Sequence, residues 1–311
     1  MDKQSALPKK APLWTRIKKA KEVYLLVLPG VVWYAIFAYI PIYGLTLAFK
    51  TYKASLGIFG SPWIGLENYV YVFRDPSFME AVWRTIYINA GRLIFQFPVP
   101  IILALILNEV HVRRYKKVVQ TIYTFPHFLS WVIVSSVLVN FLSVNGVVNG
   151  IIGFFGGESV NFVGSPKLFQ PLLYATESWK SAGWSMIIYI AAIAGIDTEQ
   201  YESAQIDGAS RLQAIWYITL PGLKSTIIVM FILAVGNLMN AGFDQIFNMS
   251  NAATSKVAEI LDMYIYRITF QGAADFSFSS AVSLFRSIVN FLLLLTADRV
   301  CKLLGSDGLF G

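Results

Sequence analysis

The sequence predicts an all-α integral membrane protein: a bundle of six transmembrane helices with both termini in the cytoplasm. Three observations support this fold class. Hydrophobic residues make up 56% of the chain and charged residues only 14%, whereas soluble domains carry about 25% charged residues. Several apolar runs have a length of roughly 20 residues, which is what a helix needs to cross a bilayer. The basic residues cluster in the short segments between these runs, as membrane topology requires.

Six apolar runs define the expected spans, which cover about 23–49, 83–107, 118–142, 172–196, 225–243 and 281–304. Prolines inside the first two spans are tolerated where neighbouring helices satisfy the freed backbone groups. We therefore divide the 311 residues into a basic tail (1–22), one transmembrane domain (23–304) and a short C-terminal tail (305–311).

The distribution of Lys and Arg predicts the orientation. The N-terminal tail, the loops after the second and fourth spans and the C-terminal end together hold fifteen of these residues, and the opposite loops hold six. The positive-inside rule places the richer side, and with it both termini, in the cytoplasm. The net charge of +7 is explained in this way without a nucleic-acid partner.

The loops on the opposite side are long. Segment 51–82 is rich in aromatic residues, segment 143–171 is rich in Gly and Asn, and segment 244–280 has a helical pattern around 257–268. Two interpretations stay open for each loop: it docks another protein, or it rests on the lipid headgroups.

The cytoplasmic stretch 197–224 is longer and more patterned than a simple connection between helices. Thr198 is a plausible helix N-cap. Gly208 fits a break between two short helices, because glycine adopts positive φ at little cost. Leu212 and Trp216 are one turn apart on the second helix. We expect Pro221 to end this second helix before the fifth span begins.

This stretch resembles the coupling signature of binding-protein-dependent ABC importer permeases. The pattern is Glu-Ala-Ala-x-x-Asp-Gly-Ala followed nine residues later by Ile-x-Leu-Pro, and two positions depart from it, Ser203 and Ile215. The resemblance implies that segment 197–222 docks on a separate ATPase subunit and moves with it. The residues that it assigns to coupling are Glu202, Ser203, Ala204, Asp207, Gly208, Ala209, Ile218, Leu220 and Pro221.

The whole chain is similar to the carbohydrate-uptake branch of that family, in particular to permeases for polysaccharides or uronate oligosaccharides. The segments that carry this resemblance include Phe243-Asp244-Gln245-Ile246-Phe247 and the start of the last span around Ser280–Phe285. The resemblance implies a type I importer in the cell membrane. Its partners would be a second, homologous permease, an ABC ATPase dimer and an extracytoplasmic binding protein that delivers an oligosaccharide.

Polar residues inside the spans are candidates for the substrate pathway, because they are costly in lipid and generally face a pore or a partner helix. Arg92 and Arg286 would suit a carboxylate-bearing sugar through paired hydrogen bonds. The alternative is that several of these residues bridge helices or extend to the membrane surface. The candidates are Asn89, Arg92, Gln96, Glu177, Trp179, Lys180, Trp184, Asn237, Asn240, Asp244, Arg286 and Asn290.

Catalytic chemistry is not expected in this chain. Segment 222–226 loosely resembles a phosphate-binding loop but lacks its glycine spacing, so ATP and Mg²⁺ would be bound by the partner ATPase and this chain would hold no cofactor. The single Cys301 and the two histidines form no metal-ligand pattern. The main alternative function is a secondary transporter or channel subunit that is not coupled to ATP, and such a protein has no use for a coupling segment.

Overall fold

The computed structural model describes residues 18–240, 242–272, 274–303, 305 and 308–309. Most of the expected basic tail (1–22) lies outside the described residues, as do 306–307 and 310–311 of the C-terminal tail. Within the described part, the regular structure is helical throughout, and an isolated antiparallel bridge joins Lys50 and Trp63. The predicted all-α class is confirmed.

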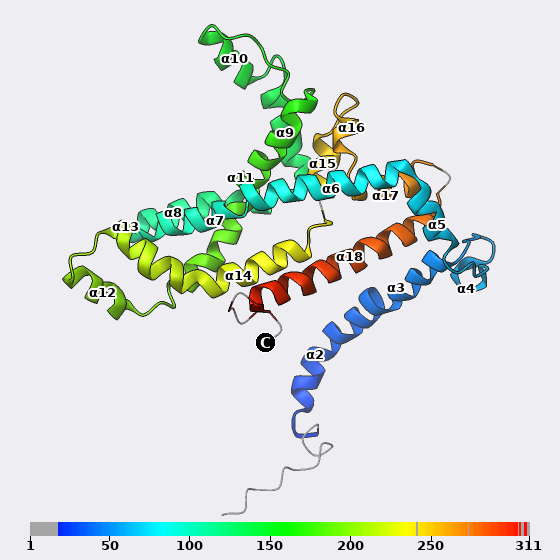
Figure 1. Cartoon of the computed structure of the whole chain (residues 1–311), viewed down its shortest axis with the longest axis horizontal. Helices are drawn as coiled ribbons and strands as arrows, with labels where there is room; N and C mark the ends of the chain where they lie inside the picture. The colour runs from blue at the N-terminus through cyan, green and yellow to red at the C-terminus, as the bar shows by residue number, and fades with distance from the viewer. Residues whose placement is uncertain (1–17, 241, 273, 304, 306–307, 310–311) are drawn as a thin grey trace, which may run out of the picture.

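The described helices follow one another with short connections (Figure 1). They are α2 (Lys21–Tyr34), η1 (Ala35–Tyr39), α3 (Ile40–Ile42), η2 (Tyr43–Phe49), α4 (Gly57–Gly60), α5 (Glu67–Arg74), α6 (Pro76–Phe95), α7 (Pro98–Asn108), α8 (Arg113–Thr124), η3 (Phe125–Phe128), α9 (Trp131–Leu142), α10 (Val147–Phe154), α11 (Pro166–Ile193), α12 (Thr198–Ile206), α13 (Arg211–Ala214), η4 (Ile215–Thr219), α14 (Leu220–Gly236), α15 (Phe243–Met249), α16 (Ser255–Ala258), α17 (Leu261–Phe270) and α18 (Phe276–Leu303).

Five helical stretches of the described chain are long and apolar enough to cross a membrane, and α11 together with α12 makes up to six. The five are Lys21–Phe49, Pro76–Asn108, Trp131–Phe154, Arg211–Gly236 and Phe276–Leu303. Helix α11 alone is not apolar enough to count as a span, because polar residues such as Glu177 and Lys180 lower the hydropathy of its middle. It counts only together with α12, and the two helices are bent by 74° relative to each other. Five to six spans therefore agree with the sequence prediction.

The expected third span, 118–142, is not one straight helix. Helix α8 ends at Thr124, a 3₁₀ turn covers Phe125–Phe128, and α9 begins at Trp131. Pro126 lies in the break; it has no N–H to continue the α-helical hydrogen bonds. The apolar stretch in this region instead runs from α9 into α10, so the prediction was about one helix too early in the chain.

Pro221 does not end a helix, contrary to the sequence prediction. Helical structure is continuous from Arg211 to Gly236, and a π-helical turn, Ile215–Thr219, directly precedes the proline. A π turn shifts the hydrogen-bond register by one residue, which accommodates a residue that lacks an N–H. The first span repeats this arrangement, with a π turn at Ala35–Tyr39 just before Pro41.

Helix α11 lies at the centre of the packed body. It packs on α7, α8 and α14, and α14 packs in turn on α18. Gly183 allows α11 to approach α8 closely, because a Cβ atom there would lie 2.0 Å from the carbonyl oxygen of Tyr123. Met186 and Tyr189 of α11 are fully buried between these helices. This helix therefore supplies the rigid wall against which the functional side chains are placed.

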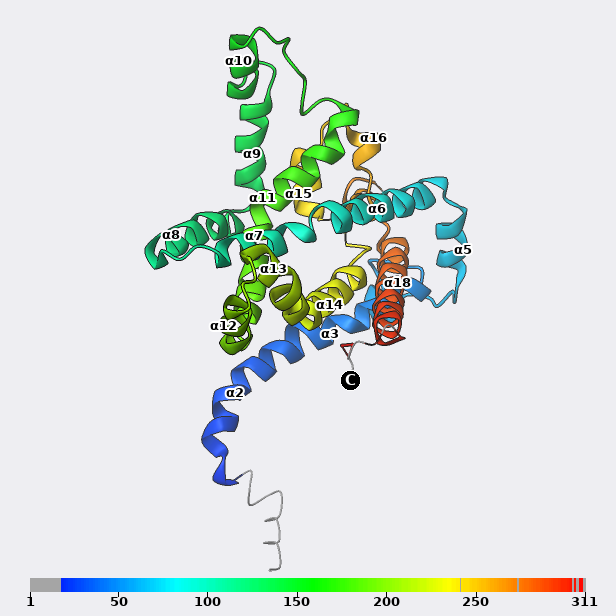
Figure 2. The ribbon, with the colours of Figure 1, turned by 60° about the vertical axis from the view of Figure 1, so that its left-hand side comes forward.

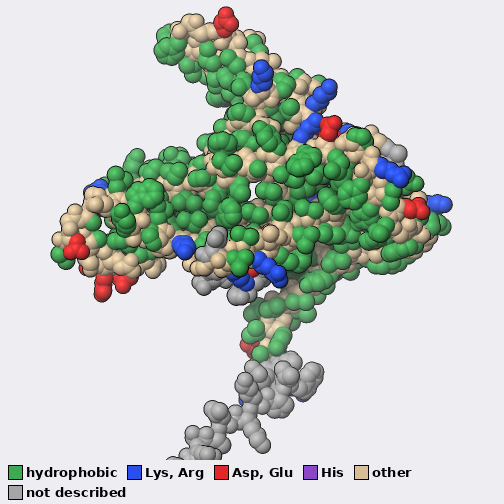
Figure 3. All heavy atoms as spheres, viewed as in Figure 1, with side chains coloured by type: hydrophobic (Ala, Val, Ile, Leu, Met, Phe, Trp, Pro, Cys, Tyr) green, Lys and Arg blue, Asp and Glu red, His purple; other side chains and the backbone are tan. Residues whose placement is uncertain are grey.

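Two segments extend from the body in opposite directions, α2 on one side and α9 with α10 on the other (Figures 1 and 2). None of the residues of α2 is buried within the chain. Hydrophobic side chains cover most of the surface seen in Figure 3, and acidic side chains gather at the end that carries α12. A surface of this kind is typical of a protein whose solvent is lipid.

Candidate functional site

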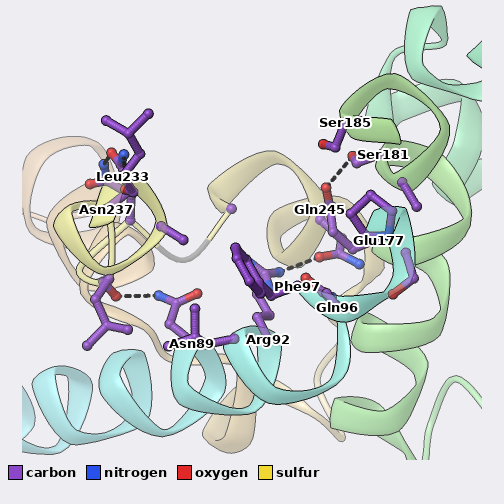
Figure 4. A pocket seen from close by; sticks show the side chains of 18 of the residues that line it. Asn89, Arg92, Gln96, Phe97, Glu177, Ser181, Ser185, Leu233, Asn237 and Gln245 are labelled. Atoms are coloured by element: carbon purple, nitrogen blue, oxygen red, sulfur yellow. Dashed lines mark hydrogen bonds between the residues drawn. The ribbon is translucent and has the colours of Figure 1, made fainter. Parts of the chain in front are cut away.

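A polar cavity of about 580 Å³ opens between α6, α7, α11, α14 and α15. Figure 4 shows its lining, in which side chains from segments far apart in the sequence point toward one another. Asn89 fixes one wall: its amide donates to the Leu238 carbonyl over 2.6 Å, which joins α6 to the end of α14. The cavity is therefore built by tertiary packing of the spans.

Arg92 and Gln245 form the central contact of the cavity. A terminal nitrogen of the Arg92 guanidinium donates to the Gln245 side-chain oxygen at 2.5 Å (Figure 4). Gln245 is fully buried, and its amide donates to the Leu173 carbonyl and the Thr176 hydroxyl on α11. These bonds hold the Gln245 oxygen toward the arginine, so α15 and α11 together orient the guanidinium.

Arg92 forms no direct salt bridge in the described part of the chain. None of the four ion pairs found there includes it, and its buried Nε atom has no hydrogen-bond acceptor. Glu177 lines the same cavity and its charge acts on Arg92, but it forms no direct ion pair with the guanidinium, and its carboxylate accepts from the Ser181 hydroxyl at 2.5 Å. A cation in a membrane span that has no direct salt bridge marks a functional site by default.

Gly242 brings the backbone close to this arginine. Its φ of 69° is left-handed, and a Cβ atom built there would lie 2.8 Å from the Arg92 guanidinium. Glycine adopts this conformation without strain. The N-terminal turn of α15 can therefore approach the guanidinium to a distance that a larger residue would prevent.

Seven of the twelve pathway residues predicted from the sequence line this cavity: Asn89, Arg92, Gln96, Glu177, Asn237, Asn240 and Asp244. Gln96 donates to the Tyr174 carbonyl over 3.3 Å. Asn240 donates to the side chain of Asn237 at 3.0 Å, so the two amides form one polar patch at the end of α14.

The other five predicted residues lie elsewhere. Arg286 pairs with Asp262. Lys180 donates to the His127 carbonyl at 3.0 Å, and Trp184 stacks on the His127 ring with centroids 4.8 Å apart, so both hold the break between α8 and α9. The Asn290 side chain accepts from the Met239 N–H. Half of the Trp179 surface is exposed, away from the cavity.

Sequence reasoning missed several polar residues of the lining. Ser181 and Ser185 follow Glu177 at intervals of four residues, and all three face the cavity from α11. This spacing identifies one helix face and would have identified them. Gln245 gave no such signal, because its place beside Arg92 depends on how α15 folds back onto α6.

The predicted coupling segment forms the expected corner. Gly208 has φ of 80° between α12 and the helix that begins at Arg211. Asp197, not Thr198, caps α12, and its carboxylate accepts from the Glu199 N–H. Ser210 and Gln213 form a reciprocal capping box that starts α13. The corner therefore has well-defined ends on both sides.

Large apolar side chains are exposed on this corner. Ile206 is 87% exposed and Tyr217 is 79% exposed, and Leu212 and Trp216 are also exposed. Glu202, Ser203, Asp207 and Gly208 are exposed too, whereas Ala204, Ala209, Ile218 and Leu220 are half-buried. The residues assigned to coupling from the sequence are therefore surrounded by larger, exposed apolar side chains.

Comparison with known proteins identifies the family. Residues 96–304 match the model of the binding-protein-dependent transport system inner membrane component. The chain is 42% identical to the polygalacturonan/rhamnogalacturonan transport system permease protein YteP of Bacillus subtilis (97% of this chain, 94% of the relative). It is 41% identical to the protein LplB of the same organism (94% and 92%).

Solved structures give the same result. A bacterial ABC transporter involved in the import of the acidic polysaccharide alginate contains a chain with a TM-score of 0.85 and 38% identity; the match covers 94% of this chain and 99% of that one. A bacterial alginate ABC transporter, crystallised with an alginate pentasaccharide-bound periplasmic protein, matches equally well, at 37% identity over 96% and 99%. The chain thus belongs to the family of binding-protein-dependent transport system inner membrane components.

Proposed function

We propose that this chain is a permease subunit of an ATP-driven importer in a bacterial cell membrane, and that it translocates an acidic oligosaccharide delivered by an extracytoplasmic binding protein. The relatives with 42% and 38% identity are named for polygalacturonan/rhamnogalacturonan and for alginate. These polymers have uronate sugars in common, so their transport paths must accept carboxylates.

We infer the substrate class from the contacts that the Arg92 side chain makes and lacks. Its guanidinium faces a 580 Å³ cavity, donates to a neutral amide and forms no direct salt bridge in the described chain. Arginine binds carboxylates through two parallel hydrogen bonds, and its Nε still lacks an acceptor. A uronate carboxylate would supply a direct anionic contact and the missing acceptor together.

The rest of the lining suits the neutral parts of a sugar. Asn237, Asn240 and Gln96 present amide groups that donate to and accept from hydroxyl groups, and Phe97 and Trp131 present aromatic faces. Such a mixture of a few polar groups and apolar surface is usual in small-molecule sites. The arginine would select for charge, and the amides would bind any sugar ring.

The coupling segment supports docking of a separate ATPase. Its exposed apolar side chains, Ile206 and Tyr217 among them, would fill an apolar groove, and the acidic residues Glu202 and Asp207 beside them would meet basic groups at the rim. Large apolar side chains with a polar rim are the usual anatomy of a protein interface. Hydrolysis of ATP would then take place on the partner.

A second permease subunit would complete the assembly. In the most apolar 18 residues of the first span no residue is buried within this chain, although Leu47 and Ala48 at its end are buried. In the corresponding part of the span formed by α9 and α10, only 11% is buried. Lipid covers part of such surface, and a homologous permease would cover the part that faces the translocation path. The basic segment at the start of α8 and the corner at α12 lie toward the same end of the body (Figure 1), which supports a cytoplasmic position for both.

Co-purification tests the ATPase partner. We expect wild-type chain, expressed with its neighbouring permease and ATPase, to retain the ATPase, and Glu202→Lys and Gly208→Val to lose it while the permease pair survives. The Val side chain is strained at a φ of 80°. Glu158→Lys, a charge reversal at an exposed site outside the corner, is the control. Retention of the ATPase by both corner variants would refute coupling at this segment.

A further inference from the structure

Helix α12 is held in place with almost no packing. None of its nine residues is buried. Among the described residues, one side-chain hydrogen bond links α12 to another helix: the Tyr201 hydroxyl lies 3.0 Å from the Thr219 hydroxyl of the π turn that precedes α14. A helix without a buried face needs such a specific contact to keep one position, because its isolated stability is marginal.

The direction of this bond follows from the surroundings of Thr219. The Thr219 hydroxyl donates to the Ala214 carbonyl over 3.4 Å, and because a hydroxyl has a single hydrogen, Tyr201 is the donor in the bond between them. Thr219 is 1% exposed, so water does not readily replace Tyr201. The π turn thus presents a buried, fixed acceptor to α12.

The two ends of the segment are also held together. A Cβ atom at Gly222 would lie 2.6 Å from the Ile196 side chain, so the start of α14 and the residue before the Asp197 cap are in close contact. Leu223, next to this glycine, is fully buried against α11. The segment is therefore a closed loop with a packed base, one side-chain hydrogen bond from α12 to the π turn, and a corner at Gly208.

We infer that the Tyr201–Thr219 hydrogen bond transmits force between the coupling segment and the span formed by α13 and α14. This inference rests on the proposed function, since it needs an ATPase that moves α12. Displacement of α12 would pull on the π turn, whose register is already adapted to Pro221, and would shift α14 as a rigid element. Tyr201 is thus a positioning residue: it sets how α12 moves the cavity wall and does not itself bind substrate.

The test removes one hydroxyl at a time. Tyr201→Phe and Thr219→Val eliminate the bond with little change in shape, and Thr219→Ser keeps it. Tyr115→Phe is the control, because Tyr115 is an exposed tyrosine of α8, outside the coupling segment, for which no side-chain hydrogen bond is found among the described residues. Each variant is purified as the full complex and reconstituted with its binding protein. Two quantities are measured: the ATPase bound per permease, and the sugar imported per ATP hydrolysed.

We expect Tyr201→Phe and Thr219→Val to bind the ATPase as the wild type does but to import about fivefold less sugar per ATP, the factor for loss of one hydrogen bond. The double variant should be no worse than either single one, and Thr219→Ser and Tyr115→Phe should behave as the wild type. If Tyr201→Phe imported as much sugar per ATP as the wild type, the inference would be overturned. Loss of ATPase binding in Tyr201→Phe would also overturn it, because Tyr201 would then be a docking residue. A wild-type chain that binds no ATPase would overturn the proposed function itself.

Discussion

Arg92 of α6 donates a hydrogen bond to Gln245 of α15 across 153 residues of sequence, and this bond is the central contact of the polar cavity. The pairing is unusual because the acceptor is neutral. Burial of a cation without a direct anionic contact is costly, so the arrangement is useful where the anion comes with a ligand. The substrate prediction depends on this relationship.

The first prediction concerns Arg92 itself. Arg92→Gln should lower the uptake of a uronate oligosaccharide by roughly tenfold to hundredfold, because a hydrogen bond to a charged group contributes about 1.5–3 kcal/mol. Arg92→Lys should recover only part of this, since lysine cannot form the paired geometry. The measurement is uptake at subsaturating substrate. Arg84→Gln, on the same helix but in an ion pair with Glu80, should stay near wild type. Equal uptake by Arg92→Gln and wild type would contradict the assignment.

The second prediction concerns Arg286, which joins α18 to Asp262 of α17. Arg286→Met should lower the free energy of unfolding by about 1–3 kcal/mol, because it leaves a partly buried carboxylate unpaired. The double variant Arg286→Met with Asp262→Asn should recover much of that loss. Thermal unfolding in detergent measures both. If Arg286→Met abolished uptake with an unchanged melting temperature, Arg286 would be a substrate contact after all.

The third prediction concerns the close approach of α11 and α8. Gly183→Ala should destabilise the protein by about 1–3 kcal/mol, because the added Cβ atom would overlap the Tyr123 carbonyl. Gly150→Ala, within α10, meets no atom within 4 Å and should be neutral or stabilising by up to about 1 kcal/mol. Melting temperatures of the two purified variants give the comparison. Equal effects would mean that the two helices are further apart than described.

The fourth prediction concerns how the stability of the fold depends on pH through a contact between Asp75 and Tyr264. The Tyr264 hydroxyl donates to the Asp75 carboxylate at 2.6 Å. Burial raises the pKa of this carboxyl, but hydrogen bonds from Tyr264 and from Ser77 outweigh burial and hold the pKa of Asp75 below its ordinary value. Burial, and then the bond to Asp75, raises the pKa of Tyr264, so the phenol stays protonated at neutral pH.

Because the pKa of Asp75 is lower in the folded state than in the unfolded state, the contact stabilises the fold above the unfolded-state pKa. This stabilisation is lost as the pH falls through the folded-state pKa. Tyr264→Phe should therefore lower the melting temperature at pH 7, and the difference from wild type should shrink at acidic pH. Tyr266→Phe is the control, since its ring packs among Phe243 and Phe247. A difference that grew on acidification would have the wrong sign for this account.

Much of the fold could be predicted from the sequence, because span length and charge bias are set by the bilayer. The break at Phe125–Phe128 was missed, since the apolar character of 118–142 is the same whether the helix continues or turns. Pro221 was misread for a related reason. Proline ends an α-helix by default, and only the local backbone reveals the π turn that accommodates it.

The candidate site was predictable in part. Polar residues within spans could be named from the sequence, and seven of twelve line one cavity. Which arginine faces the cavity could not be decided, because Arg92 and Arg286 look alike in sequence. The choice depends on Asp262, a residue 24 positions from Arg286 that folds back to neutralise it. The contact between Arg92 and Gln245 likewise depends on tertiary packing, which the sequence alone does not reveal.

Uptake by reconstituted complexes tests the central claim most directly. The wild-type chain, its partner permease, the ATPase and the binding protein are placed in proteoliposomes, and import of a uronate oligosaccharide is compared with that of its carboxyl-reduced, neutral counterpart. The account predicts import that requires ATP and favours the acidic sugar, and a preference that falls at least about tenfold in Arg92→Gln. Import without ATP, or an acid preference that Arg92→Gln leaves intact, would contradict it.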